Sequence, residues 1–161
     1  METGNKKIEF NYIGIINTPF INLENMPIQP KASEAIGKIT IFDEYIEGFD
    51  SVSLFSHLFL LYHFHQIQQK KIKVKPFLDN KERGIFATRA PSRPNPIGLS
   101  IVRLLEVKGN ELIVGNVDML DGTPLLDIKP YVPRFDIFQD ANNGWLPDDV
   151  DLKNIKSDTR F

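Results

Sequence analysis

Three features that would assign a protein to a broad class at once are missing from this sequence. It contains no cysteine, which excludes a disulfide framework, a thiolate metal site and a cysteine nucleophile. No run approaches the roughly 18–20 apolar residues needed to span a bilayer, and the polar N-terminal residues do not form a secretory signal. We therefore expect a cytoplasmic protein that has no membrane partner.

The sequence also lacks the two common phosphate-binding motifs. Neither G-x-G-x-x-G nor G-x-x-x-x-G-K-[ST] occurs, so binding of a nucleotide in the Rossmann or P-loop manner is excluded. What is present is ordinary for a globular protein: 161 residues, 42% of them hydrophobic and 25% charged, predict one folded domain. The formal net charge of −2 excludes a protein that is basic over its whole surface.

The charges are nevertheless segregated along the chain. Residues 66–103 carry a net charge of +7, and the rest of the chain carries −9. This predicts a local anion-binding face on a protein that acidic residues otherwise keep soluble. A solvated lysine-rich loop is the alternative for residues 67–75, whereas the arginines of residues 83–103 lie among prolines and glycines, and guanidinium groups fit phosphate and carboxylate. The basic residues of the segment are Lys70, Lys71, Lys73, Lys75, Lys81, Arg83, Arg89, Arg93 and Arg103.

Short strand patterns separated by turns dominate the chain. Apolar residues alternate at Ile8, Phe10 and Tyr12, and Lys108-Gly109-Asn110 predicts a hairpin turn between two longer patterns. Eleven prolines and ten glycines leave little room for long helices. The pattern predicts an all-β fold, a barrel or a sandwich, with short helical or irregular connections. The expected strands cover residues 8–17, 37–42, 54–67, 85–88, 97–107, 111–117 and 125–131.

The end of the chain differs from the rest. From about Asp136 onward the sequence is polar and acidic, and Trp145 is its one large apolar anchor. We interpret residues 137–161 as an acidic C-terminal extension that packs on the folded domain or on a partner chain.

Three histidines lie close together in the sequence, at His57, His63 and His65. On one strand, all three would point to the same face, as metal ligands would. No fourth ligand has the spacing of a known site, and the neighbouring residues are aromatic. We therefore expect a mixed core and pocket wall, and no metal.

Two clusters carry most of the chemistry. The first is Thr88-Arg89-Ala90-Pro91-Ser92-Arg93-Pro94-Asn95-Pro96-Ile97-Gly98, where prolines would hold arginine and asparagine side chains in a fixed geometry. The second runs from Asp118 through the turn Asp121-Gly122-Thr123-Pro124 to Asp127-Ile128-Lys129-Pro130-Tyr131. Each has a structural alternative: the prolines can simply connect two strands, and Asp127 and Lys129 can simply pair on a surface. Together they predict a ligand site on rigid loops at strand ends.

These clusters resemble the TsaA-like (TrmO) family, whose hallmarks are a T-R-[SA]-P-x-R-P-N-P-I-G loop and a D-G-T-P-x-x-D-I-K-P-Y segment. The resemblance continues upstream in three segments and covers about residues 8–136, so we take this range as the barrel domain. The sequence is similar to the short form of the family, without the C-terminal domain of longer bacterial members. The upstream segments are Ile13-Gly14-Ile15-Ile16-Asn17-Thr18-Pro19-Phe20, Pro27-Ile28-Gln29-Pro30 and residues 55–66.

The resemblance implies a single small closed β-barrel, usually dimeric, that binds S-adenosylmethionine outside the Rossmann architecture. It also implies methylation of the N6 nitrogen of threonylcarbamoyladenosine, which lies next to the anticodon at position 37 of tRNA. The implied cofactor-binding residues are Pro27, Ile28, Gln29, His65, Gln66, Arg89, Leu99, Asp121, Gly122, Thr123 and Pro124. The implied reaction pocket contains Arg93, Asn95, Asp127, Lys129 and Tyr131.

Methyl transfer from a sulfonium is an in-line displacement, so such an enzyme mainly has to hold donor and acceptor in a near-attack geometry. The acceptor nitrogen sheds a proton, for which Asp127 or the Asn95 carbonyl would be the acceptor. Arg93 could bind either a phosphate or the threonyl carboxylate, and we prefer the carboxylate. We expect residues 66–103 to contact phosphates of the anticodon arm. Two alternatives remain: an S-adenosylmethionine-binding protein with a different methyl acceptor or a sensing role, and a purely structural nucleic-acid-binding barrel.

Overall fold

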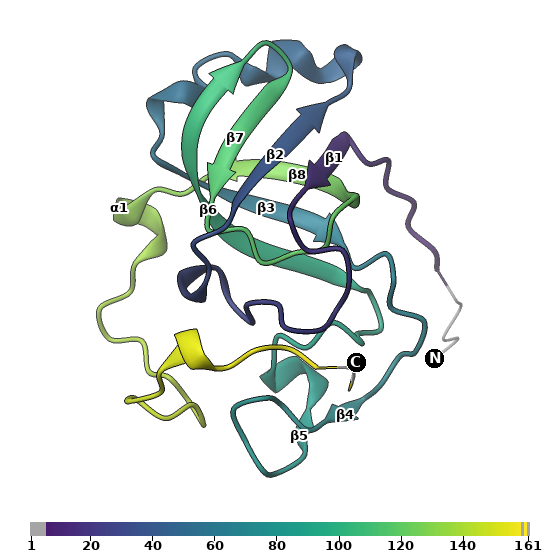
Figure 1. The fold of residues 1–161 in the computed structure, drawn as a ribbon, viewed down its shortest axis with the longest axis vertical. Helices are drawn as coiled ribbons and strands as arrows, with labels where there is room; N and C mark the ends of the chain where they lie inside the picture. The colour runs from purple at the N-terminus through teal and green to yellow at the C-terminus, as the bar shows by residue number, and fades with distance from the viewer. Residues whose placement is uncertain (1–5, 159, 161) are drawn as a thin grey trace.

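The computed structural model describes residues 6–158 and 160, and its centre is a closed antiparallel barrel of six strands (Figure 1). The strands follow one another around the barrel in the order β1-β2-β7-β6-β3-β8. Their bounds are Gly14–Asn17 for β1, Ile36–Ile41 for β2, His57–His63 for β3, Ile97–Lys108 for β6, Glu111–Gly115 for β7 and Thr123–Pro130 for β8. The prediction of an all-β fold with a single small closed barrel is confirmed.

Alternation of side chains along the strands explains which residues fill the barrel. On β3, Leu58, Leu60 and Tyr62 are buried, while the odd-numbered residues between them face outward. Strand β6 pairs with β3 and repeats the pattern, with Ser100 and Val102 buried. The core is completed by apolar residues of the other four strands and of the segment after β7: Ile16, Ile39, Ile41, Leu112, Val114, Val117, Met119 and Leu125.

The hairpin predicted at residues 108–110 is confirmed, since β6 and β7 pair on either side of it. The expected strand over residues 8–17 is wrong for its first half, because β1 begins only at Gly14. Strand β2, its partner, ends at Ile41 and the chain turns into the 3₁₀ helix η2 (Asp43–Phe49), so regular pairing stops near Ile13, whose N–H donates to the Leu125 carbonyl and whose carbonyl accepts from the Phe42 N–H. The expected strand over residues 54–67 shortens to β3, preceded by η3 (Val52–Leu54).

The strand expected over residues 85–88 is also wrong. Residues Ile85–Ala87 form the 3₁₀ helix η4, closed by a hydrogen bond from the Thr88 hydroxyl to the Ile85 carbonyl of 2.9 Å. Helix η4 follows a separate two-stranded sheet of β4 (Lys73–Val74) and β5 (Arg83–Gly84). Ile85 is buried with Val74 and Ala90 in a small second core, so this apolar residue serves local packing outside the barrel.

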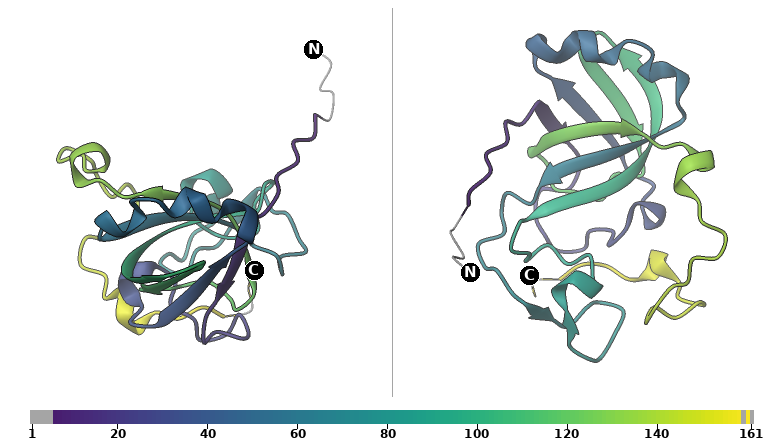
Figure 2. Two further views of the ribbon diagram at one scale, coloured as in Figure 1. Left: turned by 90° about the horizontal axis from the view of Figure 1, so that it is seen from above. Right: turned by 180° about the vertical axis from the view of Figure 1, so that it is seen from behind.

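Because neighbouring strands are antiparallel, the long loops of residues 18–35, 64–96 and 116–122 all emerge at one end of the barrel, which we call the loop end. It lies at the bottom of Figure 1, together with β4 and β5. The β6–β7 hairpin, η2 and η3 lie at the opposite, hairpin end. The views in Figure 2 show residues 6–13 extending away from the barrel.

The C-terminal segment returns to the loop end. After α1 (Pro133–Asp136) it passes along the first long loop, which contains η1 (Pro30–Ala32), and forms η5 (Leu152–Asn154). Lys156 forms a β-bridge with Pro27, and the indole N–H of Trp145 donates to the Ala87 carbonyl over 2.7 Å. The predicted extension thus packs on its own chain. No helix among the described residues is long and apolar enough to cross a membrane.

Candidate functional site

The loop end brings together residues that are far apart in the sequence. Nη1 of Arg89, in the second long loop, donates to Oε1 of Gln29, in the first, over 3.1 Å. Both side chains belong to the set that the resemblance assigns to the cofactor. Pro27 and Ile28 lie beside Gln29 on the same loop, where Pro27 is buried and Ile28 half-buried.

The turn at Asp121 is fixed to β1 by its carboxylate. Oδ1 of Asp121 accepts hydrogen bonds from the Asn17 side chain and from the Thr18 backbone N–H, both 3.0 Å long. These hydrogen bonds hold the pKa of Asp121 below its ordinary value, the one from Asn17 having the larger effect. Gly122 has a φ of 72°, which favours glycine, and the Thr123 hydroxyl closes the turn on the Leu120 carbonyl. Asp121 is therefore an ionised anchor at neutral pH.

Arg93 organises the proline-rich loop from within. Its Nη1 donates to the backbone carbonyls of Ile85, Thr88 and Ala90 at 3.2, 2.8 and 3.4 Å. Its guanidinium also lies 5.9 Å from the centre of the Phe86 ring. A role in shaping this loop was not expected from the sequence, from which we expected Arg93 to bind an anionic group of the substrate.

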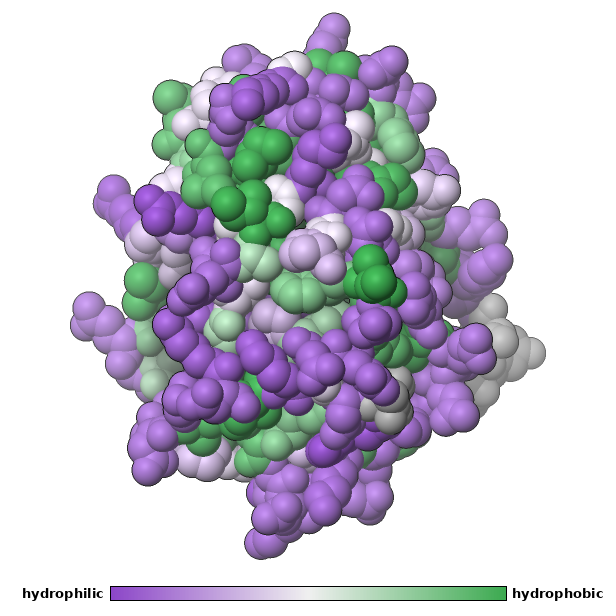
Figure 3. All heavy atoms as spheres, in the orientation of Figure 1, coloured by the Kyte–Doolittle hydropathy of each residue, from purple (hydrophilic) through white to green (hydrophobic). Residues whose placement is uncertain are grey.

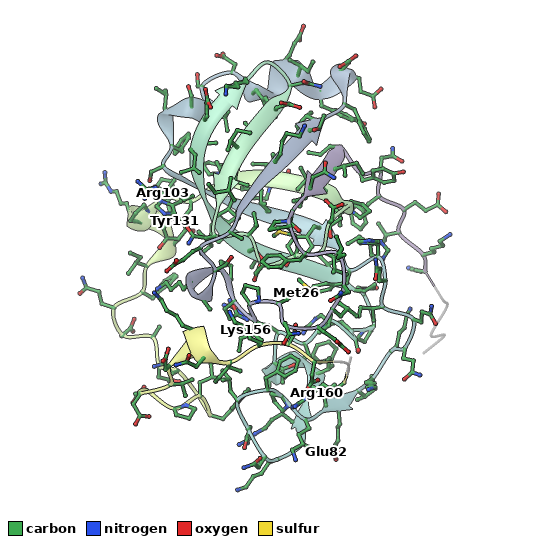
Figure 4. All side chains as sticks on the ribbon, in the orientation of Figure 1. Met26, Glu82, Arg103, Tyr131, Lys156 and Arg160 are labelled. Atoms are coloured by element: carbon green, nitrogen blue, oxygen red, sulfur yellow. The ribbon has the colours of Figure 1, made fainter. Side chains whose placement is uncertain are left out.

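The other residues of the predicted reaction pocket lie on β8 and directly after it: Asp127, Lys129 and Tyr131. Asp127 and Lys129 form an ion pair of 2.8 Å, and the hydrogen bond and negative charge of Asp127 raise the pKa of Lys129. Tyr131 packs edge-on against the Phe59 ring, with 5.4 Å between ring centres, and its backbone N–H donates to the His57 carbonyl. Since His57 begins β3, Tyr131 lies toward the hairpin end, and Figure 4 shows it beside Arg103 and far from Met26. Within one chain, the residues of the predicted reaction pocket thus form two groups, one in the proline-rich loop and one on β8 and directly after it.

The remaining predicted residues lie on the β3–β6 pair or directly beyond it, where the Phe64 N–H donates to the Pro96 carbonyl. Leu99 points outward from β6 and is 50% exposed, whereas Asn95 is exposed in the proline-rich loop. His65 and Gln66 follow the end of β3, so His65 does not share the strand with His57 and His63 as the sequence suggested. Burial, and then the charge of His63, lower the pKa of His65, which is therefore neutral at pH 7.

Three polar side chains at this end of the barrel form a network that the sequence did not predict. The Tyr62 hydroxyl lies 3.0 Å from the Ser100 hydroxyl, which donates to Oδ1 of Asp118 over 2.6 Å. Burial raises the pKa of Asp118 to about 7 and also raises that of Tyr62. The feature of the sequence that could have indicated this network is Ser100, a serine at an inward position of an otherwise apolar strand pattern. Among the described residues, no group of three or more His, Cys, Asp or Glu could hold a metal ion.

The basic segment forms a hollow of about 330 Å³ beside β4 and β5. Figure 3 shows hydrophilic side chains over this lower part of the molecule. Figure 4 shows Arg160 from the C-terminal segment close to Glu82 there. The residues that line the hollow are Lys71, Lys73, Val74, Lys75, Glu82 and Arg160.

A family model described as the tRNA-methyltransferase O N-terminal domain matches residues 15–137. The chain belongs to this family. The match spans both sequence clusters and the six strands of the barrel except Gly14, the first residue of β1, so this TrmO-type domain comprises the barrel together with its loop end.

Relatives of this TrmO-type domain carry two kinds of name. A Pyrococcus abyssi protein named "Probable S-adenosyl-L-methionine-binding protein" is 50% identical over 92% of this chain and 82% of its own. The human "tRNA (adenine(37)-N6)-methyltransferase" is 33% identical over 99% of this chain, but over only 40% of its own length. The crystal structure of TrmO from Pseudomonas aeruginosa matches with a TM-score of 0.75 and 36% identity over 88% of this chain. The chain spans 64% of that structure.

Proposed function

We propose that this protein is an S-adenosylmethionine-dependent methyltransferase that acts on N6 of threonylcarbamoyladenosine at position 37 of tRNA. The observation that carries the proposal is the hydrogen bond between Arg89 and Gln29. It joins two loops at the end of the barrel where the anchored turn of Asp121 also lies. The proposal is supported by the position of these three segments at the same end of the barrel, and by relatives up to 50% identical that are named for binding that cofactor.

Methyl transfer needs few groups beyond those that hold the cofactor and the acceptor. When bound, S-adenosylmethionine supplies an activated methyl group on a sulfonium, and the protein has to align it with the acceptor nitrogen. Rigid backbone favours such alignment, and the proline-rich loop, held by the hydrogen bonds of Arg93, is such an element. Asn95, exposed in that loop, is in a position to face an incoming base.

We further propose that the tRNA phosphates of the anticodon arm bind the basic segment of residues 66–103. The hollow lined by Lys71, Lys73, Lys75 and Arg160 concentrates positive charge at the loop end, where the cofactor is expected. This arrangement would place the RNA backbone beside the reacting groups. A tRNA substrate made in the cytoplasm also fits a cytoplasmic location.

The active form that we propose is a homodimer. In one chain, Asp127, Lys129 and Tyr131 lie on β8 and just beyond it, away from the proline-rich loop, so a second copy is the simplest way to bring the two groups together. The outer face of β6 carries an apolar row that a partner chain would cover: Ile97, Leu99, Ile101 and Leu105, from 37% to 50% exposed.

The proposed function is tested in two steps with the purified protein. Titration calorimetry with S-adenosylhomocysteine, the demethylated cofactor, is expected to give one site per chain. Transfer of labelled methyl from S-adenosylmethionine is then measured on tRNA with and without the threonylcarbamoyl group, and only the modified tRNA is expected to accept it. A folded protein that does not bind S-adenosylhomocysteine would contradict the proposal.

A second candidate function is cofactor binding with a different methyl acceptor or a sensing role. It is favoured by the names of the relatives from Pyrococcus abyssi and from Archaeoglobus fulgidus, which is 44% identical over 89% of its length, since neither mentions tRNA. Stoichiometric cofactor binding without methyl transfer to modified tRNA would support this candidate. Mass spectrometry of tRNA nucleosides from a deletion strain gives an independent answer, because only the first candidate predicts loss of a methylated nucleoside.

A further inference from the structure

The C-terminal segment contacts the first long loop directly before the residues assigned to the cofactor. The backbone N–H of Asn25 donates to the Ser157 carbonyl over 3.0 Å, and the Ser157 N–H donates to the Met26 carbonyl over 2.9 Å. The Ser157 hydroxyl accepts from the Met26 N–H over 2.9 Å and donates to the Leu23 carbonyl. Every polar group of Ser157 is thus used to hold the stretch that precedes Gln29.

The same segment contacts the second long loop close to Arg89. The Trp145 indole N–H donates over 2.7 Å to the carbonyl of Ala87, two residues before Arg89. Arg160 adds another contact, since its Nη1 donates to the Pro76 carbonyl over 3.3 Å. In Figure 1 the segment runs between the first long loop and the β4–β5 sheet. It is therefore fastened to both loops that are expected to hold the cofactor.

A fastening of this kind has a physical purpose, because the two long loops consist mostly of irregular backbone. The hydrogen bond from Arg89 to Gln29, which joins them at the site, lies at the surface. A hydrogen bond exposed to water contributes little by itself, while each loop residue that becomes ordered costs conformational entropy. Backbone hydrogen bonds to a third segment offset part of that cost before the ligand binds. Preorganisation of a site in this way increases affinity.

We propose that residues 145–158, together with Arg160, form a clasp: a positioning element that fixes the first long loop relative to the second and thereby sets the affinity for the cofactor. The family model ends at residue 137, so the clasp lies outside the residues that it matches. This inference rests on the proposed function, because it takes the cofactor to bind at Gln29 and Arg89. The clasp acts through the position of the two loops and does not itself contact the cofactor.

The first experiment is calorimetric titration of the full chain with S-adenosylhomocysteine. Ser157→Ala opens the clasp at the first long loop, because it removes the hydroxyl that pairs with the Met26 N–H and the Leu23 carbonyl. The dissociation constant should rise by about threefold to tenfold, in proportion to the fall in the fraction of chains whose loops are in place. The stoichiometry should remain one ligand per chain, whereas partial loss of the fold would lower the stoichiometry.

A second variant opens the clasp at the other loop. Trp145→Phe combined with Arg160→Gln should weaken binding by a similar factor of about threefold to tenfold. Adding Ser157→Ala should then have no further effect, because either opening breaks the same connection, whereas two independent contacts would multiply their effects. Lys153→Gln is the matched control. Lys153 joins the same segment to the first loop through an exposed ion pair with Glu34, a contact of little energetic weight, so this variant should bind like the wild type.

Hydrogen exchange gives a readout that a purely structural segment would not change. By linkage, a ligand that binds better to the closed clasp must also hold the clasp closed. Exchange of the Asn25, Met26 and Ser157 amides in the wild type should therefore slow by about threefold to tenfold or more at saturating S-adenosylhomocysteine. The amide of Asp50, which donates to the Glu47 carbonyl at the hairpin end, is the control and should not change.

The outcomes are distinct. Unchanged dissociation constants in both opened variants, or effects that multiply when the variants are combined, overturn the clasp while the proposed function stands. A wild type that binds the ligand without slower exchange at these three amides also overturns the clasp alone. Absence of binding by the folded wild type overturns the proposed function and this inference together. If a variant does not fold, the exchange measurement decides, because it uses the wild type.

Discussion

Ser33 and Ser92 are both buried serines of the loop end, and only one of them has hydrogen-bond partners. Oγ of Ser33 donates to the Val117 carbonyl and accepts from the Ala35 N–H. Oγ of Ser92 is completely buried, with no partner in the part of the chain that the structure describes. The Ser33 hydroxyl joins a long loop to the barrel. The Ser92 hydroxyl has lost its contact with water and forms no hydrogen bond that would compensate for the loss.

We expect Ser92→Ala to stabilise the protein by roughly 1 kcal/mol, because it removes an unsatisfied buried group. Ser33→Ala is the matched control and should destabilise by about 1–3 kcal/mol, since it leaves the groups of Ala35 and Val117 unpaired. Urea denaturation of both variants measures the difference. Equal losses in the two proteins would show that the Ser92 hydroxyl is satisfied after all.

Asp118→Asn should stabilise the fold at neutral and alkaline pH. The pKa of Asp118 rises from 3.8 to about 7 on folding, so its contribution to stability is complete below pH 3.8 and is lost as pH rises through 7. Removing the charge should therefore raise the free energy of unfolding above pH 7 by on the order of 2 to 4 kcal/mol, with little gain near pH 4. Urea denaturation at both pH values tests this. A loss of stability at high pH would contradict it.

Among the elements, the β3–β6 pair is the one that supports the site. Strand β6 continues directly from the proline-rich loop, and Gly98 pairs there with Tyr62. A Cβ at Gly98 would overlap the Tyr62 ring, so the missing side chain is what allows the tyrosine to enter the barrel and reach Ser100. The glycine that ends the sequence motif thus has a packing role in the core.

Gly98→Ala should lower the free energy of unfolding by at least about 1–3 kcal/mol, because the buried Tyr62 ring has to leave its position. Gly84→Ala is the control, as a Cβ there meets nothing within 4 Å and its φ is −59°. Thermal denaturation of both variants measures the cost. The inference about Tyr62 fails if the Gly98→Ala protein has the same melting temperature as the wild type.

At the scale of the whole molecule, the distribution of exposed groups is uneven. The loop end carries the lysine-lined hollow, and the outer face of β6 carries the apolar row defined above. Residues 6–13 add alternating apolar side chains, since Ile8 and Phe10 are 75% and 66% exposed. A charged end suits RNA, and apolar faces of this kind suit a second protein chain.

A homodimer is expected in solution. Sedimentation of the wild type at micromolar concentration should give twice the chain mass, and Ile101→Asp, which places a charge in the apolar row of β6, should shift it toward the monomer. Lys108→Asp, on the exposed end of the same strand, serves as the control. A monomeric wild type with unchanged cofactor affinity would remove the dimer from the proposal.

Lys73 and Lys75 should attract tRNA without taking part in chemistry. Lys73→Gln together with Lys75→Gln is expected to weaken tRNA binding and to reduce its salt dependence by about one unit of slope per lost phosphate contact. The rate at saturating tRNA should stay near that of the wild type, because uniform binding does not lower the barrier. Lys108→Gln, at the hairpin end, is the charge-matched control. Filter binding and single-turnover methylation measure the two quantities.

The sequence by itself determined the barrel and the chemical character of the loops. Alternation of apolar residues predicted β2 and the β6–β7 hairpin, because inward and outward positions of a barrel strand have opposite solvation. The motifs around Arg89 and Asp121 identified the family, and their convergence follows from antiparallel strands that bring alternate loops to one end. Local patterns failed where pairing partners end, as for residues 8–13 and 85–88.

Tertiary structure alone decided how the polar residues are used. Arg93 donates to three backbone carbonyls of its own loop, Asp127 forms an ion pair with Lys129 on β8, and Asp118 accepts a hydrogen bond from Ser100. No spacing in the sequence distinguishes these carboxylates from one another. The difference comes from solvation: the exposed Asp127–Lys129 pair keeps its charges in water, whereas burial raises the pKa of Asp118 to about 7.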